Sequence, residues 1–349
     1  MPELLALCRA GFEPECVQEL EQTLAEREGS GYSRTERDSG FVRLTWQGPD
    51  SAGQLDADQL IFTRLLWPIV QEMKNLDPKD RAKPMLEWLE ATGLKLGDLR
   101  VECADSQAGE SLRALCRGFE SAMLGLLRSR KIIDKHAKYG LIVFFVSTDH
   151  ALLGFDKVDL IKNQARGGIV RLRFPSEAPS RSTLKLEEAF QVLLTEGERE
   201  RWLQPGMSAV DLGACPGGWT YQFVRRSMRV VAVDNGQMAP SLMDSGLVEH
   251  IRADGFAFRP KKPADWLVCD MVEQPIRVAA LVGDWLGAGL CQRSMFNLKL
   301  PMKKRYAEVQ LCIETLRERA GGDLLVRAKQ LYHDREEITV LATRPLRQT

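Results

Sequence analysis

The segment Val210–Thr220 constrains the fold of this chain more than any other stretch, because an apolar strand breaks there into a glycine turn. The mostly apolar run of residues 207–212 is typical of a central strand in a parallel sheet. Gly213, Gly217 and Gly218 lack the Cβ atoms that would keep a ligand away from the backbone. The residues after the turn favour a helix, so we expect its N-terminus to face that ligand.

The spacing of these glycines narrows the class of ligand. It is neither the Gly-x-Gly-x-x-Gly pattern of dinucleotide sites nor a P-loop with its Lys-Ser/Thr. The string from Asp211 to Gly218 resembles the S-adenosylmethionine loop of class I methyltransferases, in the form typical of RNA ribose 2'-O-methyltransferases. That resemblance implies cofactor contacts at Cys215, Pro216, Gly217 and Gly218. The alternative is an ordinary glycine-rich turn of an α/β sheet.

Two acids follow the next two predicted strands. Residues 229–234 form an apolar strand that ends in Asp234, about twenty residues after the first strand, where a carboxylate accepts from ribose hydroxyls. Residues 248–253 form a third strand that runs into Asp254, which we expect to accept from the adenine amino group. The alternative for either acid alone is a helix N-cap.

Four further residues are candidates for the chemistry. Asp270 ends a fourth strand, and Lys299 lies in a fifth strand of otherwise apolar residues, where a buried amine is costly without a purpose. The carboxyl ends of parallel strands meet at one edge, so Asp270 and Lys299 should converge beside the glycine turn. Glu337 opens a late strand and reaches the same edge if that strand runs antiparallel. The alternative for Lys299 is a side chain that reaches solvent from a strand end.

These positions resemble those of a known catalytic tetrad. Lys185, Asp270, Lys299 and Glu337 stand where the Lys-Asp-Lys-Glu tetrad stands in the FtsJ-like ribose 2'-O-methyltransferases, and the string from Ser180 to Leu186 agrees with theirs. The whole chain resembles the bacterial RlmM family, which methylates a cytidine ribose of 23S ribosomal RNA. The resemblance implies S-adenosylmethionine as cofactor, and 23S RNA or a large-subunit precursor as partner. Ser182 would touch the amino-acid end of the cofactor, and Asp270 would be both a cofactor contact and a catalytic residue.

The tetrad suits the alkylation of a ribose hydroxyl. In-line methyl transfer needs the 2'-oxygen aligned and losing its proton, and a neutral Lys299 could accept that proton. The ordinary lysine pKa of about 10.4 must then fall, through desolvation and the second ammonium of Lys185. Asp270 and Glu337 oppose this fall, so the sequence leaves the net shift open. Cys269, inside an apolar strand, is interpreted as a packing residue and not as the thiolate of cytosine C5 chemistry.

Composition predicts a cytoplasmic protein. No apolar run reaches the 18 or so residues that span a bilayer, and the N-terminus lacks a secretory signal. Eight cysteines without a Cys-x-x-Cys pair and four scattered histidines predict no metal site and no disulfide framework. Lys plus Arg and Asp plus Glu both number 48, so RNA would have to bind local basic patches. Membrane and DNA are not expected partners.

The predicted fold is α/β, with a C-terminal Rossmann-like methyltransferase domain after an α+β region that binds RNA. Residues 1–65 read as a ferredoxin-like subdomain and residues 66–165 as a THUMP-like domain. A glycine- and proline-marked linker, residues 166–180, leads to the catalytic domain of residues 181–349. Two short segments, Tyr139-Gly140 and Gly154–Asp156, look like turns.

Basic side chains are expected to hold the RNA. They lie on a helix of the second domain, in the linker and just after Lys299: Arg113, Arg117, Arg128, Arg130 and Lys131; Arg166, Arg171 and Arg173; Lys303, Lys304 and Arg305. The alternative for each group is a solvated charged face. For the whole chain, the alternatives are a noncatalytic RNA-binding or ribosome-assembly factor and, more weakly, a nucleotide-dependent oxidoreductase.

Overall fold

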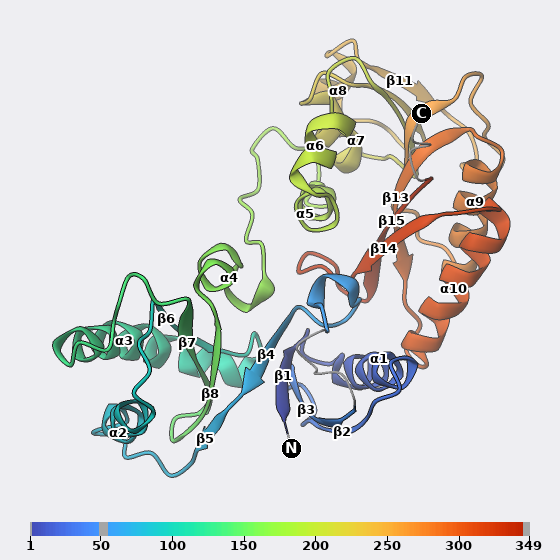
Figure 1. Cartoon of the computed structure of the whole chain (residues 1–349). Helices are drawn as coiled ribbons and strands as arrows, with labels where there is room; N and C mark the ends of the chain where they lie inside the picture. The colour runs from blue at the N-terminus through green and yellow to red at the C-terminus, as the bar shows by residue number, and fades with distance from the viewer. Residues whose placement is uncertain (1, 49–54, 345–349) are drawn as a thin grey trace. The chain divides into compact units, whose positions relative to one another are not determined.

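The computed structural model describes residues 2–48 and 55–344, which divide into two units, Met1–Ile169 and Val170–Thr349 (Figure 1). Both units contain β-sheets covered by helices, so the predicted α/β class is confirmed. Within the described ranges, no helix is long and apolar enough to cross a membrane.

The first sheet has the strand order β2-β3-β1-β4, with every neighbouring pair antiparallel. This is the ferredoxin-like order, and the described part of the connection between β3 and β4, residues 55–64, contains a short 3-10 helix. Sequence reasoning did not include β2, because its polar and mostly exposed residues show no apolar alternation and the strand is an edge held by backbone hydrogen bonds. The elements are β1 (Glu3–Leu7), α1 (Glu13–Glu26), β2 (Ser30–Arg34), β3 (Phe41–Gln47), η2 (Ala57–Gln59) and β4 (Leu65–Ile69).

The second sheet of the first unit has the order β5-β8-β7-β6, in which only β6 and β7 are parallel. Helix α3 packs on it through apolar residues at helical spacing, and its arginines face away from this core. The elements are β5 (Gln71–Met73), α2 (Ala82–Thr92), β6 (Leu99–Cys103), α3 (Gln107–Ser129), β7 (Tyr139–Ser147), β8 (His150–Lys157) and α4 (Val158–Asn163).

Two glycines predicted to mark turns lie inside strands of this sheet, so both turn predictions are wrong. A Cβ on Gly154 would collide with the carbonyl oxygen of Pro68, and one on Gly140 would lie 2.9 Å from the carbonyl oxygen of Asp98. Both glycines therefore permit a close approach of another backbone segment, which for Gly154 is β4 of the first sheet, and a single sequence does not distinguish this from a turn.

The segment after α4 begins as part of the first unit. Arg166 opens the 3-10 helix η3 (Arg166–Gly168), donates to both carboxylate oxygens of Glu120 at 2.8 and 2.9 Å, and reaches the carbonyl of Val101. The backbone N–H of Gly167 donates to Glu102 at 2.8 Å. No helix or strand follows between Val170 and Arg181. Arg166 therefore organises its own unit, while Arg173 is exposed in the irregular stretch.

The second unit is a seven-stranded sheet of order β11-β10-β9-β12-β13-β15-β14. The first five strands in this order, from β11 through β10, β9 and β12 to β13, are parallel to one another. Strand β15 is antiparallel to both β13 and β14, which is the direction that brings Glu337 to the predicted edge. The strands are β9 (Ser208–Leu212), β10 (Arg229–Val233), β11 (Val248–Ile251), β12 (Ala264–Cys269), β13 (Cys291–Lys299), β14 (Leu325–Lys329) and β15 (Glu337–Thr343).

Helices cover both faces of this sheet, which explains why its central strands are continuous apolar runs. Figure 1 shows α9 and α10 along one face and α5, α6 and α7 on the other. The core under α5 and α7 includes Phe190, Phe223 and Trp266 in mutual ring contact. The helices are α5 (Thr183–Leu193), α6 (Glu196–Trp202), α7 (Gly218–Val224), α8 (Pro240–Met243), α9 (Pro275–Gly287) and α10 (Arg305–Ala320).

Candidate active site

The predicted glycine turn lies between β9 and α7 and is tied to the neighbouring strand. The N–H of Gly213, whose φ is +76°, donates to Val233 at 2.9 Å, and Gly217 is the N-cap of α7 with a φ of +113°. A Cβ on Gly217 would collide with Leu242, and one on Gly218 would collide with the Ser182 hydroxyl. Gly217 and Gly218 are buried, and the lack of a Cβ lets the turn pack closely against its own unit.

Asp234 follows β10 and faces this turn. One carboxylate oxygen accepts from the N–H of Cys215 at 3.0 Å and the other from Gly236 at 2.7 Å. The Cys215 thiol donates to the carbonyl of Gln237, and burial together with the charge of Asp234 raises the pKa of this thiol. Each carboxylate oxygen of Asp234 keeps a lone pair, so these two acceptors suit the two hydroxyls of a ribose.

The other two predicted cofactor residues differ in what holds them. Ser182 contacts the glycine turn, as its position against Gly218 requires, and shares a hydrogen bond of 3.1 Å with Ser180. Asp254 is exposed and accepts from the N–H of Phe256 at 2.9 Å in a local turn. Its neighbour Gly255 packs against Met271, which follows Asp270. The Asp254 contact with adenine therefore stays a prediction.

The four predicted catalytic side chains come together, although 152 positions separate the first from the last. Lys299 Nζ lies 2.7 Å from Asp270 Oδ1 and also contacts Glu337. Lys185 Nζ lies 3.2 Å from Asp270 Oδ2 and contacts the other oxygen of Glu337. Each lysine thus bridges the same two carboxylates, and the cluster carries two positive and two negative charges.

Local structure explains how the four meet. Lys299 and Glu337 are directly paired residues of the antiparallel strands β13 and β15, so their side chains leave the same face side by side. Asp270 follows β12, the parallel neighbour of β13, at the same edge. Lys185 lies in the first turn of α5, and Glu188, one turn later, accepts from the backbone N–H groups of Tyr332 and His333 at 2.8 and 2.9 Å. This contact docks α5 on the loop that leads into β15.

The charges around Lys299 determine the direction of its pKa shift, which the sequence left open. Burial alone would lower the pKa of the Lys299 ammonium, but the charges of Asp270 and Glu337 and the hydrogen bonds to them raise it above its usual range. The side chain of Lys299 is 26% exposed, against 18% for Lys185 and 6% for Glu337. Lys299 is therefore charged in this arrangement, and it is the most accessible member of the tetrad.

Sequence reasoning named Asp211 as the first residue of the glycine-turn string but assigned it no role as a buried acid. Asp211 is 1% exposed and accepts from the Thr220 hydroxyl at 2.7 Å, and burial raises its pKa to about 7, helped by the charges of Asp270 and Asp234. Its position one residue before the end of an apolar strand was the available signal. Cys269 is fully buried, and burial raises its pKa to about 12, in line with a packing role.

Comparison with known proteins places this site in a class of enzymes. Residues 178–316 match the family described as FtsJ-like methyltransferase. Residues 1–67 match the RlmM ferredoxin-like domain, and residues 80–157 match the N-terminal domain of ribosomal RNA large subunit methyltransferase M. The catalytic half therefore defines an FtsJ-like methyltransferase.

Relatives extend the match to the whole chain. A ribosomal RNA large subunit methyltransferase M of Stenotrophomonas maltophilia is 49% identical over 99% of this chain and 97% of its own length. Its counterpart in Xanthomonas oryzae is 48% identical over 99% of this chain and 100% of its own. Among solved structures, TrmN from Thermus thermophilus aligns over 99% of this chain and 100% of its own at 17% identity, with a TM-score of 0.37. The chain belongs to the ribosomal RNA large subunit methyltransferase M family, as its resemblance predicted, and is a methyltransferase.

Within residues 2–48 and 55–344, no group of three or more His, Cys, Asp or Glu side chains could hold a metal ion.

Proposed function

We propose that this enzyme transfers a methyl group from S-adenosylmethionine to the 2'-hydroxyl of a cytidine in 23S ribosomal RNA. The observation that carries the proposal is the convergence of Lys185, Asp270, Lys299 and Glu337 at the sheet edge that also bears the glycine turn. The names of the relatives support large-subunit ribosomal RNA as the substrate. The choice of cytidine rests on the family resemblance alone.

The residues around the turn fit S-adenosylmethionine. Asp234 offers acceptors for the ribose hydroxyls, the partly exposed Cys215 and the exposed Pro216 offer a surface for the nucleoside, and Ser182 packs against Gly218. When bound, the cofactor supplies an electrophilic methyl group on a sulfonium. The surrounding residues would orient that group and exclude water.

In this proposal Lys299 accepts the proton of the 2'-hydroxyl. The structure begins with a charged Lys299, so the amine must lose its proton before it can act as a base. RNA that covers the exposed quarter of this side chain removes water from it, and this desolvation lowers its pKa. Lys185 contacts both carboxylates and balances one of their two negative charges when Lys299 is uncharged.

A substrate that lacks one oxygen tests the reaction. The wild-type enzyme, labelled S-adenosylmethionine and an RNA fragment that contains the target cytidine should give a 2'-O-methyl product. The same fragment with a 2'-deoxy target should give none, because the acceptor oxygen is missing. Labelling of the deoxy fragment would mean transfer to a base and would refute the proposal. Absence of turnover with RNA and with ribosomal particles would favour the noncatalytic alternative.

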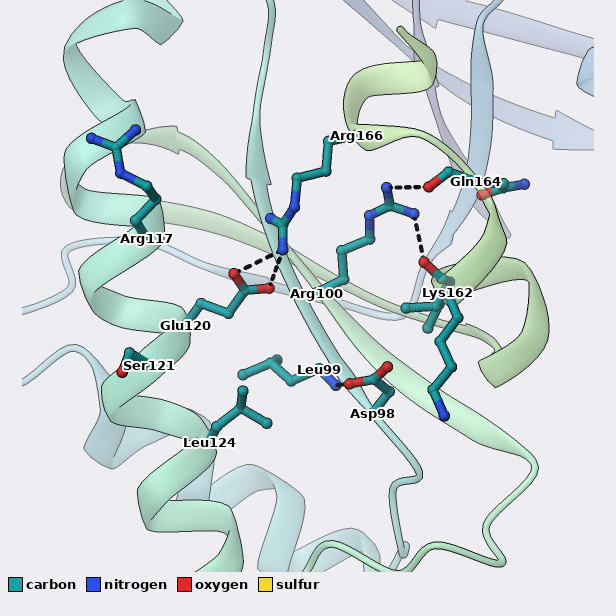
Figure 2. A pocket seen from close by; sticks show the side chains of 11 residues that line it. Asp98, Leu99, Arg100, Arg117, Glu120, Ser121, Leu124, Lys162, Gln164 and Arg166 are labelled. Atoms are coloured by element: carbon teal, nitrogen blue, oxygen red, sulfur yellow. Dashed lines mark hydrogen bonds and ion pairs between the residues drawn. The ribbon is translucent and has the colours of Figure 1, made fainter. Parts of the chain in front are cut away.

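We further propose that the first unit captures the RNA, at a cavity of about 590 Å³ between α3 and α4 with β6 as its floor (Figure 2). Leu99, Leu124 and Ile161 contribute apolar surface. Figure 2 shows the ion pair of Arg166 and Glu120 between the walls, with Arg117 extending from α3. The predicted basic helix thus forms one wall of this cavity.

Only part of the charge on that helix is available to phosphate. Arg113 pairs with Asp105 at 2.9 Å, and Arg130 pairs with Glu90 at 2.8 Å. Arg117 on α3 and Lys162 on α4 are exposed and have no acidic partner in the described residues. These two cations on opposite walls are the strongest candidates for phosphate contacts.

Charge removal tests the capture site. Arg117→Gln combined with Lys162→Gln should weaken RNA binding and reduce the salt slope of log K by about 0.7 per lost contact with single-stranded RNA. Arg130→Gln is the matched control, because Arg130, the C-cap residue of α3, pairs with Glu90 and is not among the residues that line the cavity. Equal losses in the two proteins would contradict the proposal. Removal of residues 1–169 should abolish RNA methylation and leave cofactor binding intact.

A further inference from the structure

Three buried polar side chains form a chain of hydrogen bonds behind Asp270. Asn297 Nδ2 donates to Asp270 Oδ1 at 3.0 Å, and the Thr339 hydroxyl lies 2.7 Å from Asn297 Oδ1. The same hydroxyl lies 3.0 Å from Asp334 Oδ2. Asn297, Thr339 and Asp334 are each 0% exposed. No part of the methyl transfer described above uses them, although one end of this chain is a catalytic carboxylate.

Strand register explains why they meet. Asn297 pairs with Thr339 across β13 and β15, two residues from the pair of Lys299 and Glu337. Because side chains alternate along a strand, both pairs lie on the same face of the sheet. The buried row therefore lies directly behind the catalytic row.

Counting protons fixes the direction of these bonds. Asp270 binds two ammonium groups and is a carboxylate, so Asn297 must turn its NH₂ toward it and its oxygen toward Thr339. The single proton of the Thr339 hydroxyl then goes to Asn297, since the two oxygens need a donor between them. Thr339 has no proton left for Asp334, so the proton between Thr339 and Asp334 comes from Asp334.

A protonated Asp334 agrees with its surroundings. It is fully buried, its second oxygen has no partner in the described residues, and the N–H of Leu331 donates to the first at 3.1 Å. Burial raises the pKa of Asp334 well above its usual range, and the charges of Glu337 and Glu188 raise it further. Each hydrogen bond in this chain, which we call the relay, then has its donor on the Asp334 side: Asp334 donates to Thr339, Thr339 to Asn297, and Asn297 to Asp270.

We propose that Asn297 is a positioning residue for methyl transfer, held by Thr339 and Asp334. Its amide fixes the plane of the Asp270 carboxylate, so that Oδ1 receives Lys299 at 2.7 Å and Oδ2 receives Lys185 at 3.2 Å. Without this amide, the Asp270 carboxylate is held only by the two lysine side chains, which can then shift together with it. The inference rests on the proposed function only in that methylation is the activity measured.

The experiment compares buried threonines of one strand. Thr339→Val removes the hydroxyl at nearly constant volume, whereas Thr339→Ser keeps it. Thr343→Val is the matched control, because Thr343 is 5% exposed on the same strand and its partners among the described residues are the carbonyls of Gln292 and Arg344. Asn297→Ala removes the amide itself. For each protein, kcat, KM for RNA, the Kd for S-adenosylmethionine and the melting temperature are measured.

The relay predicts a loss of kcat without a loss of binding. Asn297→Ala and Thr339→Val should lower kcat roughly tenfold to a hundredfold, as expected for a catalytic group displaced by up to about 1 Å, with KM and Kd within about threefold of wild type. Thr339→Ser should restore kcat to within about twofold, and Thr343→Val should lower only the melting temperature. A kcat for Asn297→Ala within twofold of wild type, or equal kcat values for Thr339→Val and Thr343→Val, would overturn the inference.

The proposed function can fail separately. If wild type methylates a 2'-deoxy target, the acceptor assigned above is wrong, and the comparison of variants remains valid with that substrate.

Discussion

Replacement of Lys299 separates the two things that this amine does, which are to carry charge and to accept a proton. Lys299→Met removes both, and Lys299→Arg keeps the charge but cannot accept a proton, because the guanidinium pKa lies above about 12. If Lys299 is the proton acceptor, both substitutions should abolish most turnover. If Lys299 only balances charge, Lys299→Arg should retain most of the turnover.

The magnitude follows from the contacts. Loss of a positioned general base costs about 10² to 10⁴ in rate, so kcat should fall by that factor in both variants. Lys299→Met also removes one of the two cations that bridge Asp270 and Glu337, and a hydrogen bond to a charged group contributes about 1.5 to 3 kcal/mol. At about 2 to 4 °C per kcal/mol, the melting temperature should fall by about 3 to 12 °C. The melting temperature of Lys299→Arg should fall less, because the arginine keeps the ion pairs with Asp270 and Glu337.

Single-turnover methylation with labelled S-adenosylmethionine measures the chemical step, and calorimetry measures the affinity for the cofactor. That affinity should stay within about threefold of wild type, since an interaction that acts mainly in the transition state affects rate and not binding. Combination of Lys299→Met with Glu337→Gln should cost little more than Lys299→Met alone, because the tetrad acts as one unit.

The pH dependence has a definite sign. Lys299 must lose its proton to act, and Asp270 and Glu337 raise its pKa, so the wild-type rate should rise with pH through neutrality. Glu337→Gln removes one of the charges that raise this pKa, so the remaining activity should begin its rise at lower pH. A flat rate from about pH 6.5 to 9, or a Lys299→Arg enzyme with more than a tenth of the wild-type rate, would refute the assignment of Lys299 as base.

Three further results are expected. Asp234→Ala should lower S-adenosylmethionine affinity more than tenfold by calorimetry, and unchanged affinity would remove Asp234 from the cofactor site; Gly217→Val is a poorer probe, because its side chain would collide with Leu242. The pKa of Asp211 in the folded state is raised to about 7, so the folded state holds a proton that the unfolded state releases above about pH 4. The free energy of unfolding should therefore fall from about pH 4 to 7. Denaturant titrations of Asp211→Asn should lack this fall. Hydrogen bonding from Arg43 lowers the pKa of Glu72 in the folded state to about 2, so the stability that this ion pair contributes is present above about pH 4.3 and lost as pH falls toward 2. In thermal melts, Glu72→Gln should therefore lose less stability in acid than the wild type. An unchanged acid transition would exclude the ion pair as the cause of acid sensitivity.

The sequence determined the features that depend on neighbouring residues. The apolar run before Gly213 predicts a buried strand, and the glycines predict a turn with positive φ, since burial and positive φ each leave a local signature. Asp234, Asp270 and Lys299 could be placed at one edge because parallel strands of an α/β sheet end together. The family resemblance supplied Lys185 and completed the tetrad.

Tertiary structure decided whatever depends on register and on competing charges. Gly154 looks like a turn glycine until Pro68 is seen to lie against it, and β2 has no apolar pattern because an edge strand needs only backbone partners. The direction of the Lys299 pKa is the balance between burial and two carboxylates, and no spacing in the sequence contains that balance. The sequence shows Asn297 two residues before Lys299, but only the pairing of β13 with β15 places Thr339 beside it. Sequence patterns report what one segment prefers, whereas a site is made by distances between segments, and these are fixed only when the sheet assembles.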